Sequence, residues 1–274
     1  MIDSPNELFD EQETLVIQPG RSPPEEAAIF IFLSGVTVWL DVLSCITSGK
    51  SPRLLEFHPH AVSCTSAIKL GNIMGCENWG ILQIGRIAAL HYDQTQALQQ
   101  GTLNTTDLES RADDIKQTLR NGLAEYSLAS LEISSGPNLA FDQPRSPELY
   151  IITRIFTLAA SIYLYLVVHG YQLETYEIRS IVGEAMTILR SKMPTNLMNA
   201  IICPLFIIGS VARREDEQFY RDVFSSTAVL DLSLDHRGKI LPVLEQIWRM
   251  REATMTAWTW QDTVTISGHN LLLI

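Results

Sequence analysis

A long apolar run near the middle of the chain constrains the fold more than any other feature. From Tyr150 to Val168 nearly every residue is apolar, and neither glycine nor proline interrupts the run. A helix of about 20 such residues either crosses a bilayer or forms the centre of an all-helical core. Because helical patterns continue after the run, we interpret it as the central buried helix of a soluble protein.

Two further uncharged stretches are also expected to stay within the protein. The stretch from Ala27 to Leu40 is shorter than the ~20 residues that a membrane-spanning helix needs. The stretch from Met193 to Ala212 contains prolines and asparagines, and buried helices of an all-helical core have a similar composition. The sequence therefore predicts no membrane partner.

Helical periodicity recurs along most of the chain. The clearest apolar stripe runs from Ile178 to Leu189, with Glu177 and Glu184 on the opposite face. Asn104 is a candidate helix cap, and His91 fits the helical spacing if its side chain packs inward. Helices are expected over residues 27–48, 79–92, 105–126, 148–168, 178–189, 218–224 and 240–251, and the main strand candidate is residues 36–39. The predicted fold class is all-α, a single compact domain of about eight to ten helices.

The composition divides the chain into two parts. Residues 1–26 carry acids and prolines with little apolar pattern, which is typical of a flexible acidic leader. They lack the basic start and apolar run of a signal peptide. Residues 27–274 are expected to form the helical domain, with a loop from Ser134 to Pro147 inside it.

Charge and cysteine usage exclude several classes of protein. The chain has 20 Lys and Arg against 31 Asp and Glu, a net charge of −11, and acids directly follow its densest basic cluster, Arg213 and Arg214. Duplex DNA repels such a surface, so we expect no direct nucleic-acid contact by this chain. The cysteines form no C-x-x-C pair and are too sparse for a disulfide-stapled secreted scaffold: Cys45, Cys64, Cys76 and Cys203. An intracellular protein with reduced thiols is expected.

The segment from Ser44 to Ser51 resembles a phosphate-binding loop without matching it. That motif needs a glycine five residues before the Gly49–Lys50 pair, so that backbone N–H groups can surround the phosphates. Ser44 stands at that position. We interpret the segment as a turn that ends a helix.

Two other groups of residues suggest metal chemistry. His58, His60 and Cys64, with Glu56 and Cys76 nearby, are types of residue that bind zinc, but their spacing matches no standard zinc module. We interpret them as part of a surface loop.

Asp113 and Asp114 resemble the start of a motif that binds Mg²⁺ and diphosphate. Lys116 and Gln117 stand where that chemistry needs a further carboxylate. A solvated charged helix face is the simpler interpretation.

Common catalytic motifs are missing from the sequence, including G-x-S-x-G, H-E-x-x-H and a glycine-rich dinucleotide loop. The remaining histidines are isolated: His91, His169, His236 and His269. Three tryptophans are expected to pack in the core: Trp248, Trp258 and Trp260. No catalytic, cofactor-binding or metal-binding residue is nominated, and no cofactor is expected.

Five segments, taken in order, resemble the fungal-specific transcription factor domain, which is the regulatory region of fungal binuclear zinc cluster regulators. They cover residues 39–54, residues 75–90 with 103–123, residues 159–164, residues 203–212, and lastly Phe219 and residues 247–251 with Trp260 and the tail 271–274. The resemblance spans roughly residues 36–274. The first resembles that family's aromatic-x-Asp helix followed by a Gly-basic-x-Pro turn, and the fourth resembles its Trp-Pro-Leu-Phe-x-x-Gly segment. Cys203 replaces the usual Trp, and Ser210-Val211 replaces the usual Cys-Glu.

The resemblance implies a nuclear regulator of metabolic or secondary-metabolite genes. The six-cysteine DNA-binding cluster is absent from this chain. The resemblance therefore implies action through coregulators, an intact zinc-cluster factor as dimer partner, or a small-molecule effector. Two alternatives remain open. One is an enzyme built on the same helical scaffold for a hydrophobic substrate, using Asp113 and Asp114 or the histidines. The other is a non-catalytic scaffold for heterodimerisation.

Overall fold

The computed structural model describes residues 25–63, 65–126, 146–191, 193–226, 229, 236–253, 258–268 and 271–274. Residues 1–24 of the expected leader, residues 134–145 of the expected loop, Cys64 and His269 lie outside the described residues. Within the described part, every regular element is a helix, as the sequence predicts. The α-helices are α1 (Glu25–Ser48), α2 (His58–Ala61), α3 (Leu70–Met74), α4 (Asn78–Gln100), α5 (Thr105–Glu125), α7 (Pro147–His169), α8 (Tyr176–Ser191), α9 (Ile202–Ser210), α10 (Glu217–Ser225), α11 (Ile240–Ala253) and α12 (Trp260–Ile266), and the 3₁₀ helices are η1 (Thr195–Ile201) and η2 (Arg237–Lys239).

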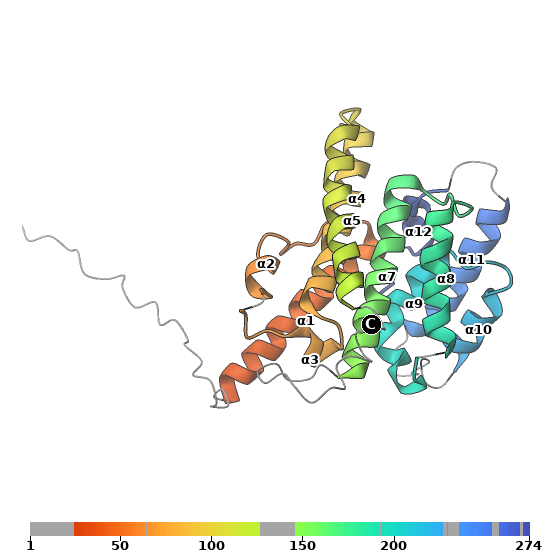
Figure 1. Cartoon of the computed structure of the whole chain (residues 1–274). Coiled ribbons are helices and arrows are strands. Elements are labelled where there is room, and N and C mark those ends of the chain that lie inside the picture. The colour runs from red at the N-terminus through yellow and green to blue at the C-terminus, as the bar shows by residue number, and fades with distance from the viewer. Residues whose placement is uncertain are drawn as a thin grey trace, which may run out of the picture.

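Helix α7 is the centre of the protein, so the long apolar run is a central buried helix, as expected. Helices α4, α5, α8 and α9 all pack against it, and Figure 1 shows it between the α1–α5 group and the α8–α12 group. Its start is well defined, because the Ser146 side chain accepts a hydrogen bond from the backbone N–H of Leu149 at 3.2 Å. Pro147 occupies the first turn, where its missing N–H is not needed.

Helix α1 corrects the strand expectation. Residues 36–39 lie in the middle of this helix. Val38, Trp39 and Val42 are all buried, so a helical face packs into the core at this point. Four residues are too few for alternation to outweigh that packing.

Helix α1 is also longer than the apolar stretch suggested. It has 24 residues and begins at Glu25, inside the expected leader. Helices α1 and α7 are both long and apolar enough to cross a bilayer by length and composition alone. Within their most apolar windows, 39% of α1 and 78% of α7 are buried inside the protein.

Helices α4 and α5 form an antiparallel hairpin with a short turn. Gly101 ends α4 at a φ of 66°, a left-handed conformation that favours glycine. The Asn104 side chain then accepts a hydrogen bond from the backbone N–H of Asp107 at 3.2 Å, so the predicted cap is confirmed. His91 is 3% exposed and packs inward, as its spacing required.

At the end of the hairpin away from its turn, Trp79 of α4 packs against Gly122 of α5. A Cβ atom at Gly122 would lie 2.0 Å from Cη2 of Trp79, closer than two carbon atoms can approach. We expect Gly122→Ala to lower the free energy of unfolding by about 1–3 kcal/mol, the usual cost of overpacking. Urea denaturation measures it, with Gly183→Ala as the matched control because a Cβ there meets nothing within 4 Å. Equal urea midpoints for Gly122→Ala and the native chain would contradict this prediction.

The C-terminal residues close the core beside the end of α1. The Thr47 hydroxyl donates to the backbone oxygen of Leu271, and the Trp260 indole N–H donates to the Ile46 oxygen at 3.1 Å. Arg237 donates to the backbone oxygen of Ile274 at 2.9 Å. The last described residues are therefore part of the folded body.

Candidate functional site

The segment that resembles a phosphate loop is a turn packed against α12. Gly49 has a φ of 66°, and its backbone N–H donates to the Cys45 carbonyl at 3.1 Å. A Cβ atom at Gly49 would lie 3.1 Å from a methyl group of Val264, so α12 packs closely on this turn. The helix-ending interpretation is confirmed.

Asp41 joins the end of α1 to the turn that follows it. Its carboxylate accepts hydrogen bonds from the backbone N–H groups of Arg53 and Leu54 at 3.0 and 2.9 Å. Its Oδ2 atom also lies 3.0 Å from Nε2 of His58. Burial lowers the pKa of His58, and the Asp41 carboxylate opposes that shift. The aromatic-x-Asp motif is thus a structural joint.

The candidate zinc ligands do not form a cluster in the described part of the chain. His58 is buried against Asp41, whereas His60 and Glu56 are exposed. Cys76 is buried in the core, where desolvation raises its pKa. The described residues contain no group of three potential metal ligands.

Asp113 and Asp114 point to different surroundings. Asp114 forms an ion pair with Arg86 on the exposed side of the α4–α5 hairpin. Asp113 instead lines a groove between α5, α7 and α8. Both aspartates are exposed, so the structure supports the solvated-face interpretation, and Asp113 also borders the groove.

The three tryptophans are core residues, as expected. Trp248, Trp258 and Trp260 are all buried. Among the isolated histidines, His91 is buried and desolvation lowers its pKa to about 4, while His169 is exposed at the groove.

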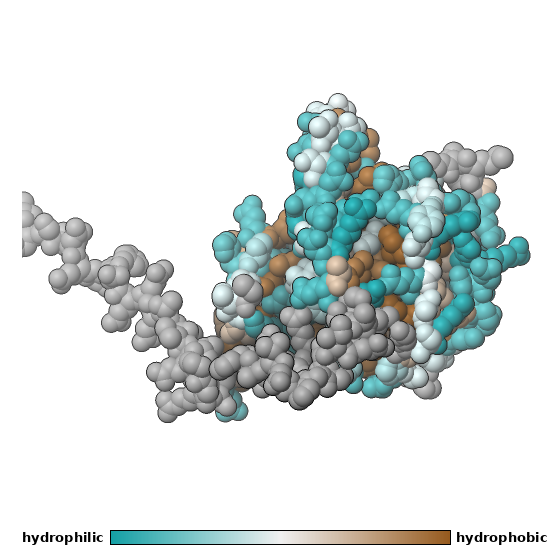
Figure 2. Space-filling model, viewed as in Figure 1, coloured by the Kyte–Doolittle hydropathy of each residue, from teal (hydrophilic) through white to brown (hydrophobic). Residues whose placement is uncertain are grey.

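The groove between α5, α7 and α8 has a volume of about 790 Å³. Figure 2 shows apolar surface over α7 between the more polar walls of α5 and α8. The apolar lining comes from all three helices: Ala112, Leu119, Leu123, Leu164, Tyr165, Val168 and Ile181. Because most small-molecule sites are apolar clefts of about 300–1,000 Å³, this groove is the candidate binding site.

An ion pair crosses the groove. Nζ of Lys116, on α5, lies 2.6 Å from Oε1 of Glu177, on α8, and Arg120 approaches the same oxygen at 3.9 Å. The hydrogen bond from Lys116 is the main cause that lowers the pKa of Glu177. Glu177 lies in the first turn of α8, where the helix dipole also favours negative charge. The two walls are thus linked above the apolar floor.

A second hollow, of about 470 Å³, lies on the other side of α8. There, Arg190 of α8 pairs with Asp216 at 2.7 Å, which connects α8 to the turn before α10. Arg251 of α11 donates to the carbonyl oxygens of Ser210 and Ala212 at 2.6 and 2.7 Å. Helix α8 therefore separates the groove from the junction of α9, α10 and α11.

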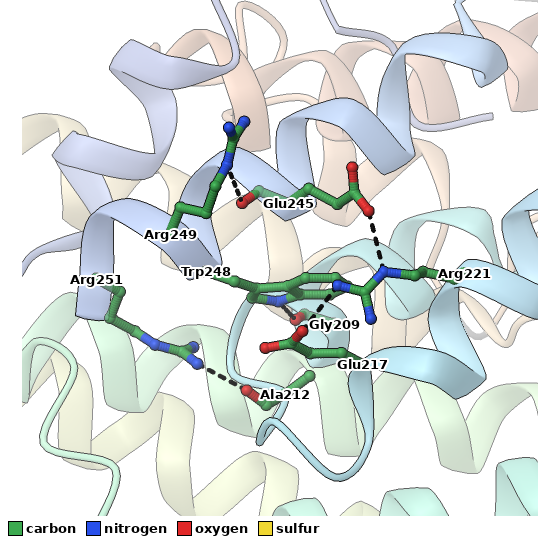
Figure 3. Close-up of polar contacts among 8 residues, drawn as sticks. All are labelled: Gly209, Ala212, Glu217, Arg221, Glu245, Trp248, Arg249 and Arg251. Atoms are coloured by element: carbon green, nitrogen blue, oxygen red, sulfur yellow. Dashed lines mark hydrogen bonds and ion pairs between the residues drawn. The ribbon is translucent and has the colours of Figure 1, made fainter. Parts of the chain in front are cut away.

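Figure 3 shows how that junction is held together. The indole N–H of Trp248 donates to the Gly209 carbonyl at 2.7 Å, and the Arg221 guanidinium lies 5.3 Å from the Trp248 ring. Arg221 also pairs with Glu217 at 2.8 Å and Glu245 at 3.0 Å. Two of the segments that resembled a known family, residues 203–212 and 247–251, thus meet in direct contact.

Sequence reasoning did not find the charged pair in the groove. The helical periodicity places Glu177 on the polar face of its helix. Lys116 stands out in the sequence only because it occupies a position where a Mg²⁺ site would need a carboxylate. Their contact depends on how α5 and α8 pack on α7, and no motif in either helix signals it.

Comparison with known proteins gives a consistent family match. A family model described as "Fungal specific transcription factor domain" matches residues 8–274. Pestheic acid cluster transcriptional regulator 3 of Pestalotiopsis fici is 36% identical over 255 residues, which is 93% of this chain and 45% of that protein. Trichothecene biosynthesis transcription regulator TRI10 of Trichoderma arundinaceum is 26% identical over 245 residues, 89% of this chain and 54% of that protein.

Transcription factor dibT of Pestalotiopsis microspora is 25% identical over 265 residues, which is 91% of this chain and 42% of that protein. The chain therefore spans about half the length of the curated relatives it matches. No solved structure gives a significant match.

Proposed function

The chain belongs to the fungal specific transcription factor domain family, and from this membership we propose that it is the regulatory region of a nuclear regulator of a secondary-metabolite gene cluster. One observation carries the proposal. A relative named as a cluster transcriptional regulator is 36% identical over 93% of this chain. Two more relatives, named as a biosynthesis regulator and a transcription factor, match about nine-tenths of the chain.

The charge of the chain favours an indirect role at the promoter. With a net charge of −11, its surface is unsuited to the DNA backbone. DNA contact then belongs to another segment of the regulator or to a partner, such as an intact zinc-cluster factor. Coregulators are the second class of partner that we propose.

The regulatory mechanism that we propose is a shift of the helical bundle between two packings. Helix α8 is well placed for such a shift. One side of it faces the groove with Lys116 and Glu177, and the other side is tied to the α10 turn through Arg190 and Asp216. A signal received in the groove would thereby reach the junction of α9, α10 and α11.

Deleting the gene and measuring all transcripts together with metabolites tests this function. We expect a coherent set of neighbouring biosynthetic genes to lose expression and to regain it when the native gene is restored. Chromatin immunoprecipitation of the tagged protein should then recover the promoters of the same genes. Unchanged transcripts with a single accumulating intermediate would overturn the proposal in favour of an enzyme.

A further inference from the structure

The protein's own Glu177 carboxylate occupies a defined position in the groove. The Glu177 carboxylate lies 2.6 Å from the Lys116 ammonium and 3.9 Å from the Arg120 guanidinium. All three side chains are part-exposed at 34–62%, so the carboxylate sits at the mouth of the groove and not in the core. A site that stabilises one carboxylate through two cations can stabilise another of similar geometry.

The surroundings of this anion position define what else would bind there. Below it lies the apolar floor, and Ser161 and Ser180 are the small polar residues of the lining. The Ser161 hydroxyl donates to the Thr157 carbonyl of its own helix at 2.9 Å. The volume of about 790 Å³ suits a small molecule of a few fused or linked rings. The aromatic residue Tyr176 is 87% exposed at the start of α8, where it can cover one end of such a molecule.

We infer that the groove between α5, α7 and α8 binds a small, flat organic acid whose anionic group replaces Glu177 between Lys116 and Arg120. This inference rests on the proposed function for its biological meaning, because the acid would serve as the effector of the regulator. Its apolar rings would lie on the floor formed by α7, where burial of apolar surface supplies most of the affinity.

The charges that line the groove favour replacement of Glu177 by the acid over binding beside it. Glu109, Asp113 and Glu177 line the groove with only Lys116 and Arg120 as permanent cations. A further anion beside Glu177 would meet an excess of negative charge. Once Glu177 swings out to solvent, both cations are available to the acid.

Replacement of Glu177 has a direct structural consequence. The ion pair with Lys116 links α8 to α5, and losing it leaves α8 anchored through α7 and through the Arg190–Asp216 pair. Binding of the acid thus favours a packing in which α8 is free of α5. The acid would bind the packing without the Lys116–Glu177 pair more tightly than the packing with it. Such a difference in affinity shifts the populations of the two packings.

Fluorescence titration of the purified chain with 8-anilinonaphthalene-1-sulfonate tests the site. This probe carries a sulfonate anion on linked aromatic rings, and its uncharged analogue N-phenyl-1-naphthylamine serves as the comparison. Lys116→Gln combined with Arg120→Gln should weaken sulfonate binding by about tenfold, because each part-exposed charge pair is worth a few-fold in affinity. Glu177→Gln should strengthen it by about fivefold, since the competing carboxylate is gone.

The matched control is Arg111→Gln, which removes a cation from α5 away from the groove. Arg111 pairs with Asp93 at 2.7 Å on the α4 side of the hairpin. This variant should bind the sulfonate as the native chain does, and none of the variants should change binding of the uncharged analogue by more than about twofold. Near-ultraviolet circular dichroism checks that every variant keeps its tertiary packing.

Three results would overturn the inference. They are equal binding of both probes by the native chain, weaker sulfonate binding by Glu177→Gln, and a preference of the native chain for a cationic dye such as auramine O. The titration needs no promoter or cell, so it can fail while the transcript profile still shows a regulator. Conversely, the titration can succeed while the transcript profile shows no regulator, so failure of the binding site and failure of the proposed function are distinguishable.

Discussion

Replacing Trp248 with alanine is expected to cost about 3–5 kcal/mol of unfolding free energy, the range for truncating a buried large aromatic side chain. The Trp248 side chain is 2% exposed and lies at the junction of α9, α10 and α11. Its loss opens a cavity between these helices and leaves the buried Gly209 carbonyl without its 2.7 Å donor. It also removes the ring on which Arg221 rests.

Chemical denaturation at pH 7 measures this effect, and two further variants separate its causes. Trp248→Phe keeps most of the ring and loses the N–H donor. The Gly209 carbonyl still accepts the backbone N–H of Ala212 at 3.1 Å, so about 0.5–1.5 kcal/mol is expected from the lost hydrogen bond. Arg249→Gln, at the exposed neighbouring position, should stay within about 0.5 kcal/mol of the native chain. A loss below about 1 kcal/mol for Trp248→Ala would show that the junction does not hold the helices together.

Stability should fall steeply in mild acid because of His91. Burial lowers the pKa of His91 to about 4, whereas an unfolded chain titrates near about 6.5. Between these values the unfolded state binds a proton that the folded state does not, so unfolding free energy rises with pH over this window. The stabilisation is complete above about pH 6.5 and is lost as the pH falls toward 4, a change of about 3 kcal/mol.

Urea denaturation at several pH values between about 4 and 7 checks this prediction, with His91→Leu as the test variant. Because leucine does not titrate, the variant should lose about 3 kcal/mol less than the native chain across the window, whatever its stability at pH 7. His60→Gln is the control, since His60 is exposed. Parallel pH curves for the native chain and His91→Leu would contradict the assignment of the effect to this side chain.

The features that were predicted from the sequence are those that a single helix determines. The apolar run became α7, the stripe from Ile178 to Leu189 lies on α8, and Asn104 caps α5. Each depends on periodicity or on hydrogen bonds within a few residues. The strand expected at residues 36–39 was wrong because four residues carry too little periodic signal against the packing of a long helix.

The groove could not be predicted, because its parts come from three helices. Lys116 and Glu177 are far apart in sequence, and their contact follows only when α5 and α8 lie on either side of α7. The family resemblance was more informative about such contacts than any one motif. The fourth and last matching segments contact each other through the hydrogen bond from Trp248 to Gly209. Two segments that resemble the family are therefore neighbours in the folded protein.

The closure of the core by the C-terminal residues has a consequence for synthesis of the protein. At the end of α1, Ile46 and Thr47 form hydrogen bonds with Trp260 and Leu271, which are synthesised more than two hundred residues later. During translation α1 can pack on α3 and α4 soon after it leaves the ribosome, whereas the part of its surface that contacts α12 stays open until the end of synthesis. A chain that stops a few residues before Leu271 lacks the acceptor for the Thr47 hydroxyl, so we expect it to be released with the core open at the end of α1.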